Sequence, residues 1–191
     1  MATIAELLAS SLNALKQVQR GEDFTIIKSS DLSRTHIKRL VDNHFLKPII
    51  KGWYVVTDPR ATPGDSTAWY ASFWSFIIRY ANERYGNEWC LSAEQSLSIY
   101  TGATIIPNQV LIRAPKGNDY MVPLIPPTSV FNLGAELPSK IDTNNPYNLN
   151  LYTLAEAIIV ATPTMYRNDA LTMRTALAMV HDLSLIHISE P

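Results

Sequence analysis

The sequence predicts an α+β fold in two parts, and three features of the 191-residue chain lead to this prediction. Apolar residues recur at helical spacing in several segments, and short runs of β-branched and aromatic residues lie between them. The stretch 58–65 contains two prolines and a glycine and separates two such sets of elements, so we expect it to be a linker. Hydrophobic residues make up 47% of the chain and charged residues 17%, which is enough apolar surface to bury a core.

The first part, residues 1–57, is expected to begin with a helix and a short strand. Apolar side chains recur at helical spacing over 4–19, which predicts an amphipathic helix that ends near Gly21. A short β-branched run at 24–27 then predicts a strand.

Two further helices and a hairpin are expected to complete this part. Residues 31–46 are expected to form a short helix, a tight turn and a longer helix, with Ser33 as an N-cap. Two β-rich runs within 47–56, joined by the turn Lys51-Gly52, predict a hairpin. The order helix, strand, helix, helix, hairpin is typical of a winged helix-turn-helix.

The second part, residues 66–182, is expected to be a small mixed α/β domain. Its first helix carries an aromatic stripe from Trp69 to Tyr80, which we interpret as core rather than as a platform for stacking bases. Ser92 and Gln95 have the spacing of a capping box at the start of another helix. Residues 125–147 have weak periodicity and are expected to be loop with short strands. The remaining elements are strands at 89–91, 110–113, 120–124 and 149–152, and helices ending near 101, over 153–161, and beginning at 168 or 169.

Residues 28–51 form a basic island on a chain whose net charge is −1. The island has six basic residues against two acidic ones, a local net charge of +4. A recognition helix presents such side chains to the major groove, where Arg pairs with guanine and Lys contacts phosphates. The alternative is a solvated basic face that contacts protein. The DNA-binding residues that we expect are Arg34, Thr35, Lys38, Arg39, Lys47 and Lys51.

No catalytic, metal or cofactor site is expected in the chain. His36 and His44 have no cysteine or paired carboxylate at ligand spacing. Cys90, the single cysteine, is expected to be a buried thiol on a strand, and no phosphate-binding or nucleophile-elbow motif occurs. No apolar run approaches the ~18 residues of a membrane span and no signal-peptide pattern is present, so we expect a cytoplasmic protein.

The last nine residues, 183–191, match the translation of the transposon mosaic-end adapter used in sequencing libraries. We therefore expect the natural reading frame to be interrupted near Asp182 and the natural protein to continue past this point. The alternative is an amphipathic strand at this end of the chain.

Two stretches resemble AbiEi-type antitoxins. Residues 31–41, which close on the run Lys51-Gly52-Trp53-Tyr54, resemble the N-terminal winged helix of those proteins. A second set of segments resembles the small α/β domain that follows it there. These segments are 91–97, 107–110 and 151–157.

A further stretch is similar to the front half of long bacterial proteins of the Fic (cell filamentation) family. It comprises residues 64–74 followed by 85–89. Fic enzymes typically transfer AMP from ATP to a protein hydroxyl through a His-x-Phe-x-x-Gly-Asn-Gly-Arg loop. This chain lacks that loop, so the resemblance implies a catalytic domain beyond the interruption and no catalytic residue here.

These observations predict a DNA-binding regulatory front end of a Fic-type protein, which is not itself an enzyme. Its expected partners are DNA, the missing C-terminal domain of the same protein and, in a homodimer, a second copy. Two alternatives stay open: a protein-interaction module that docks the missing domain, and a stand-alone antitoxin-like repressor.

Overall fold

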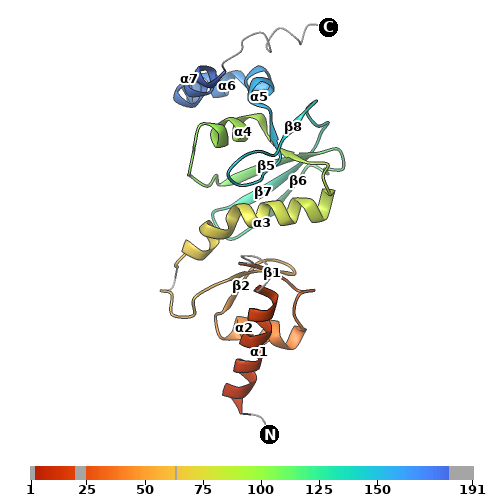
Figure 1. Cartoon of the computed structure of the whole chain (residues 1–191), viewed down its shortest axis with the longest axis vertical. Coiled ribbons are helices and arrows are strands. Elements are labelled where there is room, and N and C mark those ends of the chain that lie inside the picture. Colours follow the sequence, from red (N-terminus) through yellow and green to blue (C-terminus); the bar gives the residue numbers. More distant parts are fainter. Residues whose placement is uncertain (1–2, 20–24, 63, 181–191) are drawn as a thin grey trace. The chain divides into compact units, whose positions relative to one another are not determined.

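The computed structural model describes residues 3–19, 25–62 and 64–180, which form seven helices and nine strands in three sheets (Figure 1). The predicted α+β class is therefore confirmed. The predicted helix end at Gly21, the start of the predicted strand at Phe24 and the tail 183–191 lie outside the described residues. Among the described helices, none has both the length and the hydropathy needed to cross a membrane.

The chain divides into two compact units. The first comprises Met1–Ile77 with Pro123–Pro127, and the second comprises Ile78–Val122 with Thr128–Pro191. The division falls inside helix α3 (Thr67–Tyr85), after the segment 58–65 that the sequence marks as a linker.

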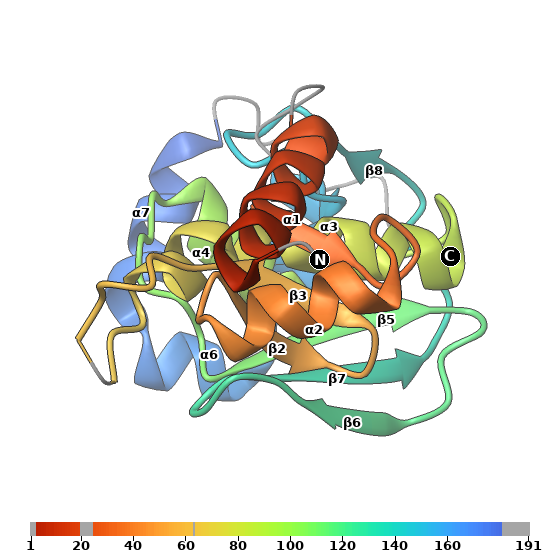
Figure 2. The same cartoon turned by 90° about the horizontal axis from the view of Figure 1, so that it is seen from below.

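A three-stranded antiparallel sheet in the order β1-β3-β2 forms the centre of the first unit. Helices α1 and α2 lie on one face of this sheet (Figure 2). The predicted first helix and hairpin are confirmed. The elements of this unit before α3 are α1 (Ile4–Gln19), β1 (Ile26–Lys28), α2 (Arg34–Asp42), β2 (Leu46–Ile50) and β3 (Trp53–Val56).

The core between these helices and the sheet follows the apolar periodicity of α1 and α2. Leu15 of α1 and Leu40 of α2 are buried against Ile27 and Leu46 of the sheet. The strands supply alternate residues to this core, because successive side chains of a strand point to opposite faces.

The first short helix expected within 31–46 is absent, so that prediction was wrong. Residues 29–32 form a turn in which the amide of Asp31 donates to the carbonyl of Lys28. The Asp31 carboxylate in turn accepts from the Lys28 amide at 2.8 Å. Asp residues stabilise such turns by hydrogen bonding to nearby backbone. The four residues of this turn leave no room for a separate helix before α2.

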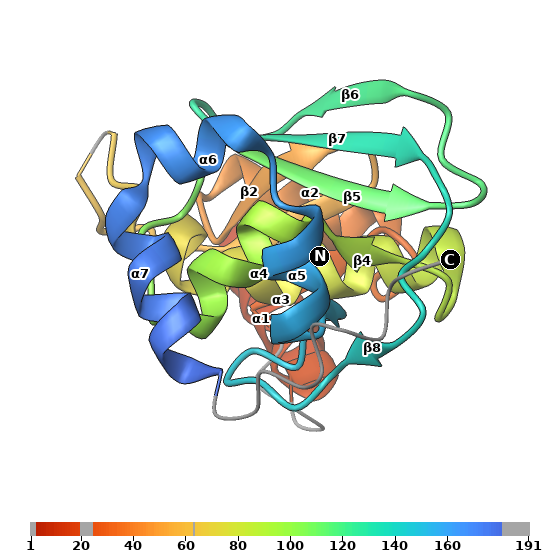
Figure 3. The same cartoon turned by 90° about the horizontal axis from the view of Figure 1, so that it is seen from above.

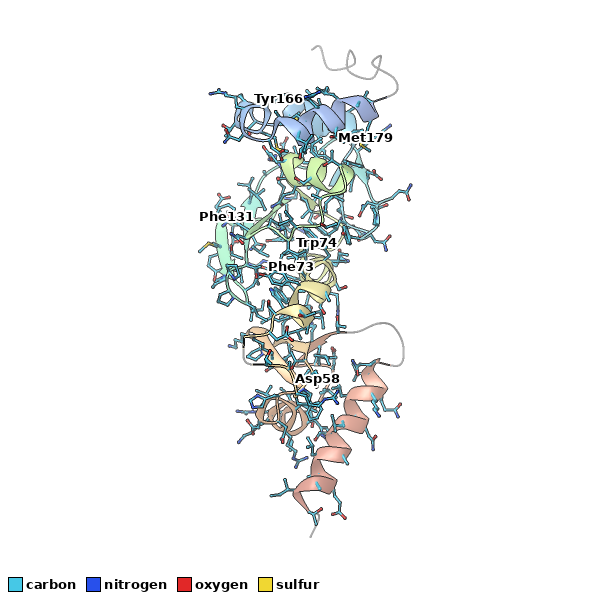
Figure 4. All side chains as sticks on the ribbon, turned by 90° about the vertical axis from the view of Figure 1, so that its left-hand side faces the viewer. Asp58, Phe73, Trp74, Phe131, Tyr166 and Met179 are labelled. Carbon is cyan, nitrogen blue, oxygen red and sulfur yellow. The ribbon has the colours of Figure 1, made fainter. Side chains whose placement is uncertain are left out.

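The opposite face of the sheet packs on aromatic residues from the first half of α3. Trp53 of β3 meets Phe76 edge to face, with ring centroids 5.6 Å apart, and Phe76 also contacts Trp69. Phe73 and Trp74, labelled in Figure 4, form a further edge-to-face pair on α3. The predicted aromatic stripe is buried, as expected for core.

The second unit contains a four-stranded sheet in the order β4-β5-β7-β6, and α4 and α5 pack together on its β4 side (Figure 3). Strands β5 and β7 are parallel and β4 pairs antiparallel with β5, so the sheet is mixed, a property that the sequence analysis did not predict. The strands are β4 (Cys90–Leu91), β5 (Gln109–Ala114), β6 (Tyr120–Pro123), β7 (Ser129–Gly134), β8 (Ile141–Asp142) and β9 (Leu151–Tyr152). The helices are α4 (Ala93–Tyr100), α5 (Leu154–Val160), α6 (Pro163–Asn168) and α7 (Ala170–Met179).

One half of the predicted capping box is confirmed and the other half is wrong. Ser92 caps α4 by accepting from the Gln95 amide. The side chain of Gln95 does not reach back to Ser92. It donates to the carbonyl of Gln109 and accepts from the amide of Leu111, at 2.7 and 3.0 Å. The Gln95 side chain thus supplies hydrogen-bond partners to backbone groups of β5 that β4 is too short to reach.

Candidate nucleic-acid interface

Helix α2 is fixed at both ends by local hydrogen bonds. Ser33 has the extended conformation of an N-cap and accepts from the His36 amide, as predicted. At the other end the Phe45 amide donates to the carbonyl of Leu40. The residue before Phe45, His44, has the left-handed conformation (φ 62°) that closes the helix. This arrangement is a Schellman-type helix end. The termini of the helix are therefore set by the sequence around it.

A side-chain contact joins α2 to α1. The Nδ1 atom of His36 lies 2.9 Å from the Oγ atom of Ser11, and the Ser11 hydroxyl also lies 3.0 Å from the carbonyl of Leu7. If the hydroxyl proton goes to Leu7, His36 donates from Nδ1. The sequence did not predict this contact, because helical periodicity relates only neighbouring positions and Ser11 and His36 are 25 residues apart.

The face of α2 that points away from the sheet carries most of the predicted residues. Arg34, Thr35 and Lys38 are exposed, as is Asp42 at the end of the helix. Within the described part of the chain, neither Arg34 nor Lys38 lies within ion-pair distance of a carboxylate. Arg39 is half-buried, so it contributes less to this face than the sequence predicts.

The hairpin turn that carries Lys51 is attached to the turn that precedes α2. The Ser29 amide donates to the Gly52 carbonyl at 2.8 Å. Gly52 has a φ of +82°, and a Cβ atom there would lie 3.2 Å from the Ser29 hydroxyl, so glycine suits the position. Lys51 is exposed beside this attachment. The hydrogen bond therefore holds the turn that carries Lys51 against the turn that leads into α2.

Lys47 lies apart from the other predicted residues. It pairs with Val55 across the sheet, and directly paired residues project from the same face. Val55 is on the face of Trp53, which packs on α3, whereas α1 and α2 cover the opposite face. The pKa of Asp65 is lowered mainly by its hydrogen bond with Thr67 and to a smaller extent by the charge of Lys47. Lys47 therefore faces the start of α3 and not the exposed face of α2.

The basic island consequently divides between the two faces of the sheet. Lys28 pairs with Trp53 in the register and its ammonium lies 5.2 Å from the indole ring, so it belongs with Lys47. The rest of the island has four basic residues and two acids, a net charge of +2. One of these acids, Asp31, accepts from the Lys28 amide in the turn before α2. We call the other five residues the α2 face: Arg34, Lys38, Arg39, Asp42 and Lys51.

In the described part of the second unit, the one cysteine of the chain is not a reactive group. Cys90 is fully buried, and this burial raises the pKa of its thiol to about 12, because ionisation would place a charge in the core. Such a thiol is a poor nucleophile. Among the residues that the structure describes, no three His, Cys, Asp or Glu side chains are grouped so that they could hold a metal ion.

A comparison of the chain with protein-family models finds no match, and a comparison with curated proteins finds none either.

Proposed function

We propose that the first unit is a compact winged helix that binds duplex DNA through the α2 face. In this proposal α2 is the recognition helix, β2 and β3 are the wing, and the turn 29–32 replaces the first helix of a helix-turn-helix. The module would serve a cytoplasmic regulatory protein of the Fic type, as the sequence resemblance implies. The B-DNA major groove is wide enough to admit an α-helix such as α2.

The observation that carries this proposal is the exposure of Arg34 and Lys38 on a helix whose opposite side is buried. Ile37 and Leu40 anchor α2 against the core, so the basic side chains are held on a rigid element. Arg34 is near the start of the helix, where recognition helices contact base edges, and Lys38 is one turn further on. Lys51 is suited to the flanking phosphates.

Removal of a single lysine from each side of the sheet tests the proposal. We expect Lys38→Ala to weaken binding to all duplexes alike, because a lysine contacts phosphate rather than a base. Each phosphate contact contributes about threefold to the ratio of affinities at 50 and 200 mM salt, so this ratio should fall about threefold in the variant. The measurement is a binding titration at the two salt concentrations with the upstream region of the gene and with a random duplex.

Lys47→Ala is the matched control. It removes the same charge from an exposed lysine that lies on the opposite face of the sheet. We expect its affinity and salt dependence to equal those of the wild type. Equal losses in the two variants would mean that the protein attracts DNA only through its overall charge and that α2 is not the binding element.

A second candidate function is protein docking through helix α7 of the second unit. Only Met173 and Ala176 of this helix are buried, against α4 and α5. Its outer surface exposes Leu171, Leu177 and Met179, the last labelled in Figure 4. Exposed large apolar side chains on a helix that also buries apolar residues against its own unit indicate a surface that a partner covers. We propose that the polypeptide encoded past Asp182 in the uninterrupted gene covers it.

This docking can be tested by co-purification of residues 1–182 with the polypeptide encoded downstream. We expect Leu171→Glu to abolish the complex, because a carboxylate would be buried without a partner. Ile105→Glu is the control, since Ile105 is as exposed as Leu171 but lies in the loop between α4 and β5. Equal retention of both variants would exclude α7 as the docking surface. A dimer of 1–182 that Leu171→Glu disrupts would identify a second copy as the occupant.

A further inference from the structure

The α2 face contains an acidic residue that the structure does not use. Asp42 is exposed at the last position of α2. Within the described residues its carboxylate makes neither an ion pair nor a hydrogen bond. The position is also electrostatically unfavourable, because the C-terminal end of a helix carries partial negative charge. Asp42 therefore contributes nothing evident to folding.

The position of Asp42 relative to Arg34 and Lys38 sets what it can contact. The three residues are spaced by four along α2, so they form one exposed stripe. At 1.5 Å per residue, Asp42 lies about 12 Å from Arg34 along the helix axis. With base pairs stacked about 3.4 Å apart, this length corresponds to three or four base pairs for a helix that follows the groove.

A carboxylate on a DNA-binding stripe distinguishes sharply between the groups that DNA presents. It is repelled by phosphates, and it accepts a hydrogen bond from the N4 amino group of cytosine in the major groove. Guanine and thymine present acceptor atoms there, which would repel it. The neighbouring basic residues meanwhile supply the attraction to phosphates that a carboxylate lacks.

We propose that Asp42 is a specificity-determining residue, which selects a cytosine about three or four base pairs from the base that Arg34 contacts. This inference rests on the proposed DNA-binding function and assigns a role to the one acid of the α2 face. It also gives a role to a carboxylate at the end of a stripe whose other two members, Arg34 and Lys38, are positively charged.

The test is selection from a randomised duplex pool by residues 1–182, followed by titration of the selected duplex and its single-base variants. We expect the wild type to enrich cytosine at one position, and replacement of that cytosine to weaken binding about 5- to 150-fold. Asp42→Asn should lose this preference in favour of adenine, which an Asn side chain contacts through two hydrogen bonds. Asp58→Asn makes the same change of charge in the segment before α3, and it should keep the wild-type preference (Figure 4).

The outcomes separate this inference from the function on which it rests. If Asp42→Asn selects the same bases as the wild type, Asp42 does not determine specificity, although DNA binding itself stands. A uniform rise in affinity for all duplexes, without a change of preference, leads to the same conclusion. If the wild type binds no duplex at either salt concentration, the proposed function fails and the role of Asp42 fails with it.

Discussion

Replacement of Asn132 with leucine is expected to lower the free energy of unfolding by about 3 kcal/mol or more. Asn132 is fully buried in the middle of β7. Its Oδ1 atom accepts from the hydroxyls of Tyr85 and Tyr80, at 2.8 and 3.3 Å, and its Nδ2 atom donates to the carbonyl of Tyr120. Leucine keeps the volume but removes the bonds to two buried hydroxyls, at about 1–3 kcal/mol each, and to the partly buried carbonyl of Tyr120.

Chemical denaturation followed by circular dichroism measures this loss, and a double-mutant cycle assigns it to the hydrogen bonds. Tyr85→Phe removes the hydroxyl with the shorter bond. In the background of Asn132→Leu it should cost much less than in the wild type, because its partner has already gone. If Asn132→Leu costs under about 1 kcal/mol, water or movement of the strand satisfies the abandoned groups and the network contributes little.

Local signals in the sequence were sufficient to predict most helices. Ser33, Ser92 and Thr153 each accept from the amide three residues later, as N-caps do. Asp169 does the same at the start of α7. These bonds form within one turn of helix, so the residues that determine them are adjacent in the sequence. The short helix α6 was missed although Thr162 caps it and Pro163 stands in its first turn, where proline is favoured, because six residues are too few to show apolar periodicity.

The sequence predicted short strands within 125–147 but could not place strand β7 among them. It lies in a region rich in proline and asparagine, and its central residue is the polar Asn132. The strand exists because all six of its residues pair with β5, in parallel register. Asn132 is tolerated inside because tyrosines from α3 satisfy it. Both causes are long-range contacts, which periodicity does not report.

The same distinction applies to the candidate interface. The outward direction of Arg34 and Lys38 follows from the positions of Ile37 and Leu40 on one helix, which the sequence contains. The direction of Lys47 depends on strand register and on which helices cover which face of the sheet. A one-residue shift in register would reverse it. The sequence therefore predicted the outward direction of the helical candidates Arg34 and Lys38 and not the direction of Lys47.

Leu40→Ala is expected to destabilise the protein by about 2–5 kcal/mol, whereas Lys38→Ala changes stability by about 0.5 kcal/mol or less. Leu40 of α2 is fully buried between α1 and the sheet, in the cluster that also contains Leu15 and Leu46. Its truncation leaves a cavity in a small core that cannot easily collapse, because three elements meet there. The free energy of unfolding of a typical domain is only about 5–15 kcal/mol, so this substitution would remove a large part of the stability of the unit.

The pair Leu40→Ala and Lys38→Ala separates folding from DNA binding on a single helix. Leu40→Ala should unfold at a lower denaturant concentration, and its folded fraction should still bind DNA with the affinity of the wild type, because Leu40 does not reach the α2 face. Lys38→Ala should show the reverse, with an unchanged unfolding midpoint and weaker binding. Measurement requires denaturation curves together with titrations corrected for the folded fraction. Should Leu40→Ala unfold at the wild-type midpoint, α2 would not be anchored by its buried stripe, and the rigid recognition helix on which the proposed function depends would be lost.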